Sequence, residues 1–226
     1  MKLSIIIPVY KEKNIDIFLK ELMENLKIFQ YEIIIVDGDK HGSTIDKISL
    51  TDVIRLISDQ KGRGHQLQKG VTTSTGDVVV FLHADTKIVK ENFIDILNAM
   101  VKGYDYGAFR LKIDGKGLLF RIIEKAVYLR TLLFKLPYGD QTIFIKKDTI
   151  KSIGGVRSIS LFEDVELMLR CKKIGLKFYF SQKYSVTSPR RWEKYGIIST
   201  TVRDIFLLIS YLLGRDVDLL YKKYYK

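Results

Sequence analysis

The sequence predicts an α/β fold with a doubly wound, mostly parallel central sheet. Short runs rich in Ile and Val lack polar interruptions, which is typical of strands covered on both faces. Over the first hundred residues these runs alternate with segments of helical periodicity. The 226 residues are 46% hydrophobic with only three prolines, which suits one good-sized domain and excludes a disordered or fibrous chain.

The first half shows a regular order of elements. Residues 3–9 form a buried first strand, and Pro8 indicates its end or an edge position. Asn14 can cap the next helix, whose apolar positions recur from Ile15 to Phe29. A second buried strand, 32–36, ends at Asp37, and TDVIRLIS contains a third, short one. A helix over 63–74, a strand over 78–82 and an amphipathic helix over 91–101 follow.

The second half is less regular. Residues 106–113 and 142–145 resemble strands, and residues 118–134 form a helix with a broad apolar face. Another helix begins near Glu163 and stops at Gly175. The chain has no internal repeat and no low-complexity linker, so we expect one domain over 1–226.

The net charge of +12 favours an anionic partner: nucleic acid, phosphorylated small molecules or acidic lipid surfaces. The basic residues are spread along the chain, which weighs against a nucleic-acid-binding module. Cys171 is the only cysteine, so no internal disulfide is possible, which fits a reducing compartment. No run of about 18 apolar residues marks a membrane span, and 3–9 is too short for a secretory signal. We expect a cytoplasmic protein.

Polar side chains follow three of the expected strands. Tyr10 and Glu12 follow the first strand, Asp37 and Asp39 the second, and His83 and Asp85 the strand 78–82. The carboxyl ends of parallel strands share one edge of a sheet, where ligands bind. Carboxylates there, together with diphosphate oxygens, are ligands that Mg²⁺ or Mn²⁺ favours.

A glycine-flanked arginine lies between these strand ends. The segment KGRGHQ contains Arg63 and Gln66, and glycines beside an arginine suit close approach to phosphate. The alternative is a turn with a surface arginine.

Several motifs together resemble a family of known enzymes. IIPVYKE, EIIIVDGDKHGST and FLHADT occur in that order, followed by LPYGDQTIF, LFEDVELMLR and TSPRRWEKYG. With these the chain resembles a family 2 glycosyltransferase over essentially its whole length. The last three motifs resemble a small branch described as transferases associated with selenium-related or radical-SAM proteins. The resemblance implies a GT-A fold with a small acceptor-side sheet and C-terminal helices. Residues 1–100 would be its nucleotide-binding half and 101–226 its acceptor-binding half.

The resemblance also implies a binding site for a nucleotide-diphosphate sugar. The residues expected to hold this donor are Pro8, Tyr10, Glu12, Asp37, Arg63, Gln66, His83 and Ala84. Asp85 takes the place of the last residue of the metal-binding Asp-x-Asp and would bind Mg²⁺ or Mn²⁺. His83 replaces the first acidic residue of that motif, and because histidine suits Mg²⁺ poorly we expect it to orient the nucleotide. Asp39, Lys40 and His41 also depart from the family pattern.

Transfer requires a base for the acceptor hydroxyl. The family's Glu-Asp pair corresponds to Glu163 and Asp164, which makes Asp164 the expected base in an inverting displacement. The metal and Arg63 would stabilise the leaving diphosphate. The alternative is structural: Ser160 to Glu163 fits a capping box, and acidic residues suit a first helical turn.

Further residues of the motifs are expected on the acceptor or diphosphate side. Arg190, Arg191 and Trp192 correspond to the family's Arg-Trp motif, with a buried tryptophan and two solvated arginines as the alternative. Asp140 and Gln141 could reach the donor sugar or the acceptor, although a turn explains PYGD equally well.

Two stretches combine apolar and basic residues, GLLFRIIEKAVYLRTLLFK and IISTTVRDIFLLISYLLG. Packing against the sheet explains most of them. The alternative is that one lies on a membrane surface and collects a lipid-linked acceptor, with the tail YKKYYK adding contacts. The protein would then be peripheral at the inner face of the membrane.

Two rival functions share this kind of fold. One is a sugar-phosphate nucleotidyltransferase, but PVYKEKN contains no glycine-rich loop after the first strand. The other is a non-catalytic nucleotide-binding protein, which the departures at His83 and Asp39 leave open.

Overall fold

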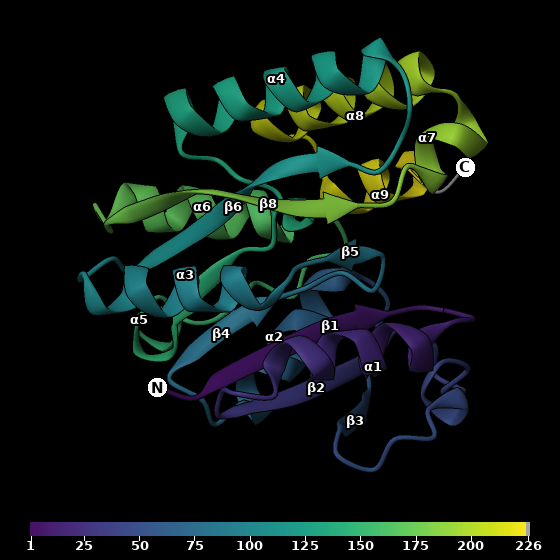
Figure 1. Ribbon diagram of the computed structural model, residues 1–226. Helices are drawn as coiled ribbons and strands as arrows, with labels where there is room; N and C mark the ends of the chain where they lie inside the picture. The colour runs from purple at the N-terminus through teal and green to yellow at the C-terminus, as the bar shows by residue number, and fades with distance from the viewer. Residues whose placement is uncertain (225–226) are drawn as a thin grey trace.

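The hydrophobic strands of the first half form the parallel part of an eight-stranded sheet in the computed structural model, which describes residues 1–224 (Figure 1). These strands are β1 (Leu3–Val9), β2 (Tyr31–Asp37), β3 (Ile54–Ile57) and β4 (Val78–Phe81). They lie in the order β3-β2-β1-β4 with every pair parallel. Pro8 lies beyond the last β1–β4 pair, Ile6 with Phe81, so its missing N–H interrupts no bond to β4.

The strands of the second half continue the same sheet. The order after β4 is β7 (Phe144–Lys146), β6 (Tyr106–Ile113), β8 (Phe178–Thr187) and β5 (Thr86–Lys87). β7 pairs antiparallel with both β4 and β6, while β6 and β8 are parallel. The expected small acceptor-side sheet is therefore not separate, because β7 joins it to the central sheet.

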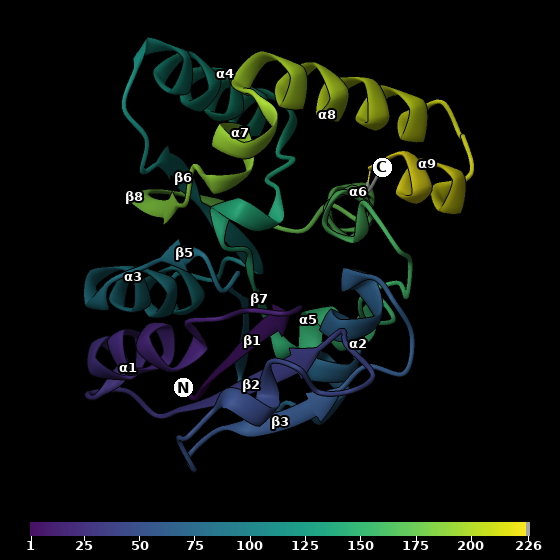
Figure 2. The same ribbon diagram turned by 90° about the vertical axis from the view of Figure 1, so that its right-hand side faces the viewer.

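Helices cover both faces of this sheet, as the doubly wound prediction required (Figure 2). α1 (Ile15–Leu26) and α3 (Lys90–Val101) lie on one face, and α2 (Arg63–Thr73), α5 (Lys147–Ser152) and α6 (Glu163–Lys173) lie on the other. Successive residues of a strand point to opposite faces. Accordingly Ile5 and Ile7 belong to the core beneath α1 and α3, whereas Ile6 belongs to the core beneath α2.

The remaining helices lie at the end of the molecule away from β1–β3, and the first of them packs on β6. They are α4 (Leu118–Phe134), α7 (Arg190–Tyr195), α8 (Ile197–Leu212) and α9 (Val217–Tyr224). Two short 3₁₀ turns, Ile45–Lys47 and Gly139–Gln141, complete the chain. Of the predicted tail, Tyr225 and Lys226 lie outside the described residues.

Both expected helix caps are corrected by the structure. Asn14 occupies the N-cap position of α1, but its side chain makes no capping hydrogen bond. The N-cap of α6 is Phe162, in the left-handed region with φ of 63°, and not Ser160. The Ser160 hydroxyl instead donates to Asp218 of α9 over 3.0 Å. The capping-box interpretation of Glu163 is therefore wrong.

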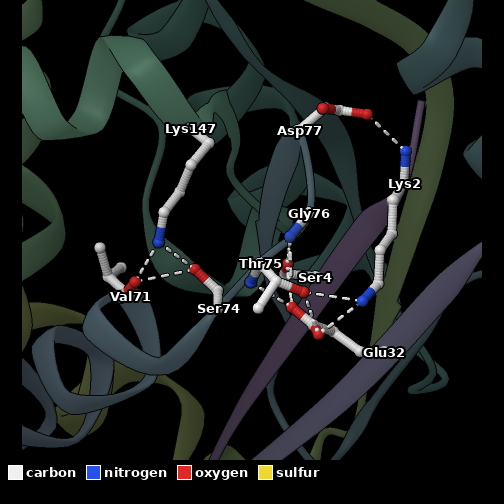
Figure 3. Close-up of polar contacts among 9 residues, drawn as sticks. All are labelled: Lys2, Ser4, Glu32, Val71, Ser74, Thr75, Gly76, Asp77 and Lys147. Atoms are coloured by element: carbon white, nitrogen blue, oxygen red, sulfur yellow. Dashed lines mark hydrogen bonds and ion pairs between the residues drawn. The ribbon is translucent and has the colours of Figure 1, made fainter.

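A polar network holds the edge of the sheet where the parallel strands begin (Figure 3). Glu32 of β2 accepts hydrogen bonds from Ser4 Oγ and Thr75 N, both at 2.6 Å, and from Lys2 Nζ at 2.8 Å. The Lys2 backbone N–H donates to Asp77 at 2.7 Å. These bonds join the starts of β1 and β2 to the turn before β4, at the edge opposite the strand ends.

Candidate active site

The carboxyl ends of β1, β2 and β4 meet at one edge of the sheet, and a cleft of about 600 Å³ opens there. We call it the strand-end cleft. Every residue predicted to hold the donor lines it except Asp37. Its predicted lining residues are Pro8, Tyr10, Glu12, Arg63, Gln66, His83, Ala84, Asp85 and Arg190. The predicted convergence of these separate segments is confirmed.

Two further clefts adjoin the strand-end cleft. An outer cleft of about 710 Å³ shares Tyr10, Glu12, Asp85 and Arg190 with it. An inner cleft of about 240 Å³ shares Arg63, His83 and Asp85 with it. The inner cleft is also lined by the predicted residues Asp140, Asp164, Arg191 and Trp192. Asp85 therefore lies where all three clefts meet.

Asp37 is the exception among the predicted donor residues. It is fully buried, and its carboxylate accepts hydrogen bonds from the backbone N–H groups of Asp39 at 2.9 Å and Thr44 at 2.7 Å. Asp37 thus fixes the loop after β2 and lines none of the three clefts. Gln66 combines both roles, since its amide donates to Val9 O and Val36 O while its side chain lines the strand-end cleft.

Arg63 begins α2 and lines both the strand-end and inner clefts. Its Nε lies 3.0 Å from Glu163 Oε1. Packing requires both flanking glycines: a Cβ on Gly62 would lie 2.6 Å from Ser160 Cα, and one on Gly64 would lie 2.4 Å from Arg157 O. Gly62 also lines the strand-end cleft beside Arg63, so the predicted approach of a phosphate to this segment stays a prediction.

Arg190 bridges two carboxylates at the strand ends. Its guanidinium makes two hydrogen bonds to Glu12, at 2.9 and 3.1 Å, and its Nε lies 3.2 Å from Asp85 Oδ2. Hydrogen bonding to Glu12 raises the pKa of Arg190 above its ordinary value. The contact ties α7 to the loops that follow β1 and β4.

His83 lies between the strand-end and inner clefts. A Cβ on Gly139 would lie 2.7 Å from His83 Nε2, so the glycine allows the imidazole to pack against this turn. Burial, reinforced by the positive charges of Arg63 and Arg190, lowers the pKa of His83 to about 3. The imidazole is therefore neutral near pH 7 and can both donate and accept a hydrogen bond.

Asp140 and Asp164 line the inner cleft, and the buried Glu163 lies beside it. Asp164 accepts hydrogen bonds from the backbone N–H groups of Gly139 and Val165, both at 2.7 Å. Burial raises the pKa of Asp140 to about 6. Burial also raises the pKa of Glu163 to about 7, although Arg63 opposes the shift. Glu163 is buried beside the cleft and does not line it.

Gln141 supports the turn and does not reach a cleft. It is fully buried; its Oε1 accepts from Arg130 Nη2 at 2.9 Å and its Nε2 donates to Phe109 O at 3.0 Å. The prediction that Gln141 contacts a ligand is not supported by this placement. Residues 139–141 form a 3₁₀ turn and not the simple turn that we weighed for PYGD.

Arg191 and Trp192 are consecutive residues of α7, and both line the inner cleft. Arg191 pairs with Asp204 of α8 at 2.7 Å, and its guanidinium lies 4.4 Å from the Tyr224 ring. Trp192 packs edge-on against Phe120 of α4, with ring centroids 6.2 Å apart.

Sequence reasoning missed several residues that line the inner cleft. Tyr138 stands within the quoted LPYGDQTIF motif, two residues before the predicted Asp140, so the motif could have revealed it. Leu207 and Asp204 of α8 gave no such signal, because they read as ordinary positions of an amphipathic helix.

Comparison with known proteins bears on what this arrangement does. Residues 4–162 match the family model described as Glycosyl transferase family 2. A dolichol-phosphate mannosyltransferase from Pyrococcus furiosus is 30% identical over 196 residues, covering 82% of this chain and 54% of that protein. The chain thus spans about half the length of this curated relative.

Solved structures share the fold at low sequence identity. Glucosyl-3-phosphoglycerate synthase from Mycobacterium tuberculosis, in complex with Mn²⁺, UDP and glucosyl-3-phosphoglycerate, has a TM-score of 0.66 at 14% identity; the match covers 95% of this chain and 81% of that one. S. aureus TarS 1-349 with UDP-GlcNAc has a TM-score of 0.61 at 19% identity, covering 83% and 58%. Mannosyl-3-phosphoglycerate synthase from Rubrobacter xylanophilus has a TM-score of 0.62 at 16% identity, covering 96% and 76%. These likenesses confirm the predicted GT-A-like fold.

Proposed function

Since this chain belongs to glycosyl transferase family 2, we propose that it moves a sugar from a nucleotide-diphosphate donor to an acceptor hydroxyl with inversion. The observation that carries the proposal is the meeting of two clefts at Arg63, His83 and Asp85. The strand-end cleft suits the nucleotide and the inner cleft suits the acceptor. The transferred sugar would then lie at their junction.

In this mechanism the residues of the two clefts have distinct roles. Asp164 takes the proton of the acceptor hydroxyl while the hydroxyl oxygen attacks the anomeric carbon. The bond from that carbon to the diphosphate breaks, and its electron pair leaves with the diphosphate. Arg63 offsets the charge that develops there, because an arginine is always protonated. Neutral His83 orients the nucleotide by a hydrogen bond.

A divalent cation fits this site only together with the donor. Within residues 1–224, no three His, Cys, Asp or Glu side chains group closely enough to hold a metal ion. Asp85 offers one carboxylate, and Mg²⁺ commonly takes one or two protein carboxylates plus phosphate oxygens. When bound, the cation would stabilise the leaving diphosphate. The complex of the M. tuberculosis synthase with Mn²⁺ and UDP supports this assignment.

We extend the proposal to the acceptor and the location. The curated relative is named for transfer to dolichol phosphate, which supports a lipid-linked acceptor here. Such an acceptor would place a cytoplasmic protein at the inner face of a membrane. The motifs LPYGDQTIF, LFEDVELMLR and TSPRRWEKYG support membership of the small branch associated with selenium-related or radical-SAM proteins.

Donor binding and transfer can be tested separately. Calorimetry with a panel of nucleotide-diphosphate sugars, with and without Mn²⁺, should find at least one donor whose binding Asp85→Ala weakens. Asp164→Asn should bind that donor like the wild type but stop release of nucleoside diphosphate from it. Flat titrations with every donor would overturn the proposal in favour of a rival function. Normal turnover by Asp164→Asn would overturn the assignment of the base.

A further inference from the structure

The outward face of α4 is apolar except for one exposed lysine, Lys125, near its middle. Leu118, Ile122, Leu129, Leu132 and Leu133 are each at least half exposed. Their spacing of three, four or seven residues places them on one side of the helix. The only acidic residue of α4, Glu124, is turned inward, where it accepts the Ile113 N–H at 2.6 Å and pairs with Arg121.

The outward face of α8 has the same character. The exposed side chains of α8 are all apolar except Ser199. Six large apolar side chains within the helix are 51–67% exposed, and a seventh, Leu213 just after the helix, is 78% exposed. These seven are Ile198, Val202, Ile205, Phe206, Ile209, Leu212 and Leu213. The charged residues of α8 lie off this face, since Asp204 pairs with Arg191 and Arg203. Leu207 points inward, packed with Leu161 and Leu220.

The two helices present these faces at the same end of the molecule. Figures 1 and 2 both place α4 and α8 at the end farthest from β3. Ile197, at the start of α8, packs in the same small core as Phe120 of α4. We refer to the exposed apolar residues of both helices as the α4–α8 face.

We propose that the α4–α8 face docks on the surface of an anionic lipid bilayer. In residues 1–224 no helix is long and apolar enough to cross a membrane, so these helices would lie in the interface with their apolar side chains inserted. The exposed lysines Lys116, Lys125 and Lys135 lie before, on and after α4, and the chain carries a net charge of +12. Acidic headgroups would neutralise these lysines.

Charge distinguishes this occupant from a second copy of the chain. A second copy would bring the same lysines to the contact, and the exposed residues of α4 and α8 include no carboxylate to neutralise them. A bilayer supplies both the apolar interior and the anionic headgroups.

Docking in this way would also orient the inner cleft. Leu207, on the opposite side of α8 from the apolar face, and the half-buried Leu208 at the edge of that face line the inner cleft together with Trp192. A lipid-linked acceptor held in the bilayer could therefore reach Asp164 along α8. This last step rests on the proposed function, whereas docking itself does not.

Vesicle co-sedimentation tests the docking directly. The wild type should bind vesicles of phosphatidylcholine with phosphatidylglycerol, and bind vesicles of phosphatidylcholine alone much more weakly. Ile122→Glu on α4 and Ile209→Glu on α8 should each reduce partitioning by at least about tenfold, because each removes a buried apolar side chain from the interface. Replacing Lys116, Lys125 and Lys135 by glutamine should reduce binding to the anionic vesicles only.

Matched controls come from the other half of the molecule. Ile28, just after α1, and Val101 of α3 are 64% and 73% exposed, so Ile28→Glu and Val101→Glu change apolar residues at least as exposed as the tested ones but outside the face. They should bind like the wild type, and circular dichroism should show every variant folded.

Absence of wild-type binding to anionic vesicles, or equal losses in the controls, would overturn the proposal. So would a dimer in light scattering that Ile122→Glu dissociates without any change in vesicle binding. Donor titrations in solution should not change in any of these variants, which separates a failure of docking from a failure of the proposed function.

Discussion

Asp140 lies in an environment that disfavours its charge. It lines the inner cleft beside Asp164, and its Oδ1 is buried with no hydrogen-bond partner in residues 1–224. Burial raises the pKa of its carboxyl from 3.8 to about 6. Between these two values the folded protein retains a proton that the unfolded chain releases, so the free energy of unfolding falls as the pH rises through this interval.

Asp140→Asn should remove this dependence, because asparagine is uncharged at every pH. The melting temperature of the variant should match that of the wild type near pH 4 and exceed it by a few degrees at pH 8. Thermal unfolding at several pH values measures the difference. Asp52→Asn replaces an exposed aspartate and serves as the control. A variant that is less stable than the wild type at pH 8 would show that Asp140 is stabilised as a carboxylate.

Single residues also mark the limit of what the sequence could predict about the site. The strand-end positions of Tyr10, His83 and Asp85 followed from the order of buried runs, since parallel strands deliver their ends to one edge. The role of Asp37 did not follow, because an aspartate that binds a ligand and one that binds its own loop look the same in a sequence. The contact of Arg190 with Glu12 joins residues 178 positions apart, and no local pattern encodes such a pair.

The predicted helices and strands succeeded where hydrophobic periodicity was strong. α4 was predicted with its observed bounds, and α2 and α3 within one residue at each end. β8 was missed, because the polar residues of SQKYS interrupt its aromatic pattern. The way in which the acceptor-side strands join the central sheet could not be predicted for a related reason: β7 has only three residues, and its pairing on both sides is a tertiary property.

Glu32, at the starts of β1 and β2, should make the free energy of unfolding depend on pH in the opposite direction to Asp140. Burial alone would raise the pKa of Glu32, but hydrogen bonds from Lys2, Ser4 and Thr75 lower it to about 2 (Figure 3). The ionised form is thus bound more strongly in the folded state. Its contribution to stability is present above about pH 4.5 and is lost as the pH falls through about 2.

Glu32→Gln should therefore be less stable than the wild type at pH 7, and the two should converge near pH 2. Urea unfolding at pH 7, 4.5 and 2.5 measures this difference. Glu91→Gln, at an exposed position of α3, should behave like the wild type throughout. A constant difference between Glu32→Gln and the wild type at all pH values would show that the ionised network is not its cause.

The start of α2 depends on close packing against the segment before α6. A Cβ on Gly64 would lie 2.4 Å from both Arg157 O and Ile159 O, so Gly64→Ala must displace backbone. We expect a loss of about 2 kcal/mol or more in unfolding free energy, together with weaker donor binding, because Arg63 moves with the helix. Gly103→Ala is the matched control: it has a φ of +84° but open space, so it should cost only about 1 kcal/mol of backbone strain. Equal losses in both variants would exclude packing as the reason for Gly64.

At the scale of the whole molecule, Arg190 connects the two halves across the strand-end cleft. It joins α7 to Glu12 after β1 and to Asp85 after β4. The Arg190 guanidinium therefore pairs with Asp85, the carboxylate that we propose as a ligand of the divalent cation. The guanidinium and the divalent cation compete for this carboxylate. Because the Arg190 side chain is 55% exposed, the competition is modest in energy.

Arg190→Gln should free Asp85 and Glu12 and increase the affinity for Mn²⁺ without nucleotide, by roughly twofold to fivefold, as measured by electron paramagnetic resonance. The same variant should bind UDP more weakly, because one positive charge leaves the strand-end cleft. Arg191→Gln is the control, since Arg191 pairs with Asp204 and not with Asp85. If both variants bound Mn²⁺ like the wild type, the pairing of Arg190 with Asp85 would not control access to that carboxylate. If Arg190→Gln bound Mn²⁺ more tightly but UDP unchanged, Arg190 would compete with the cation without contacting the nucleotide.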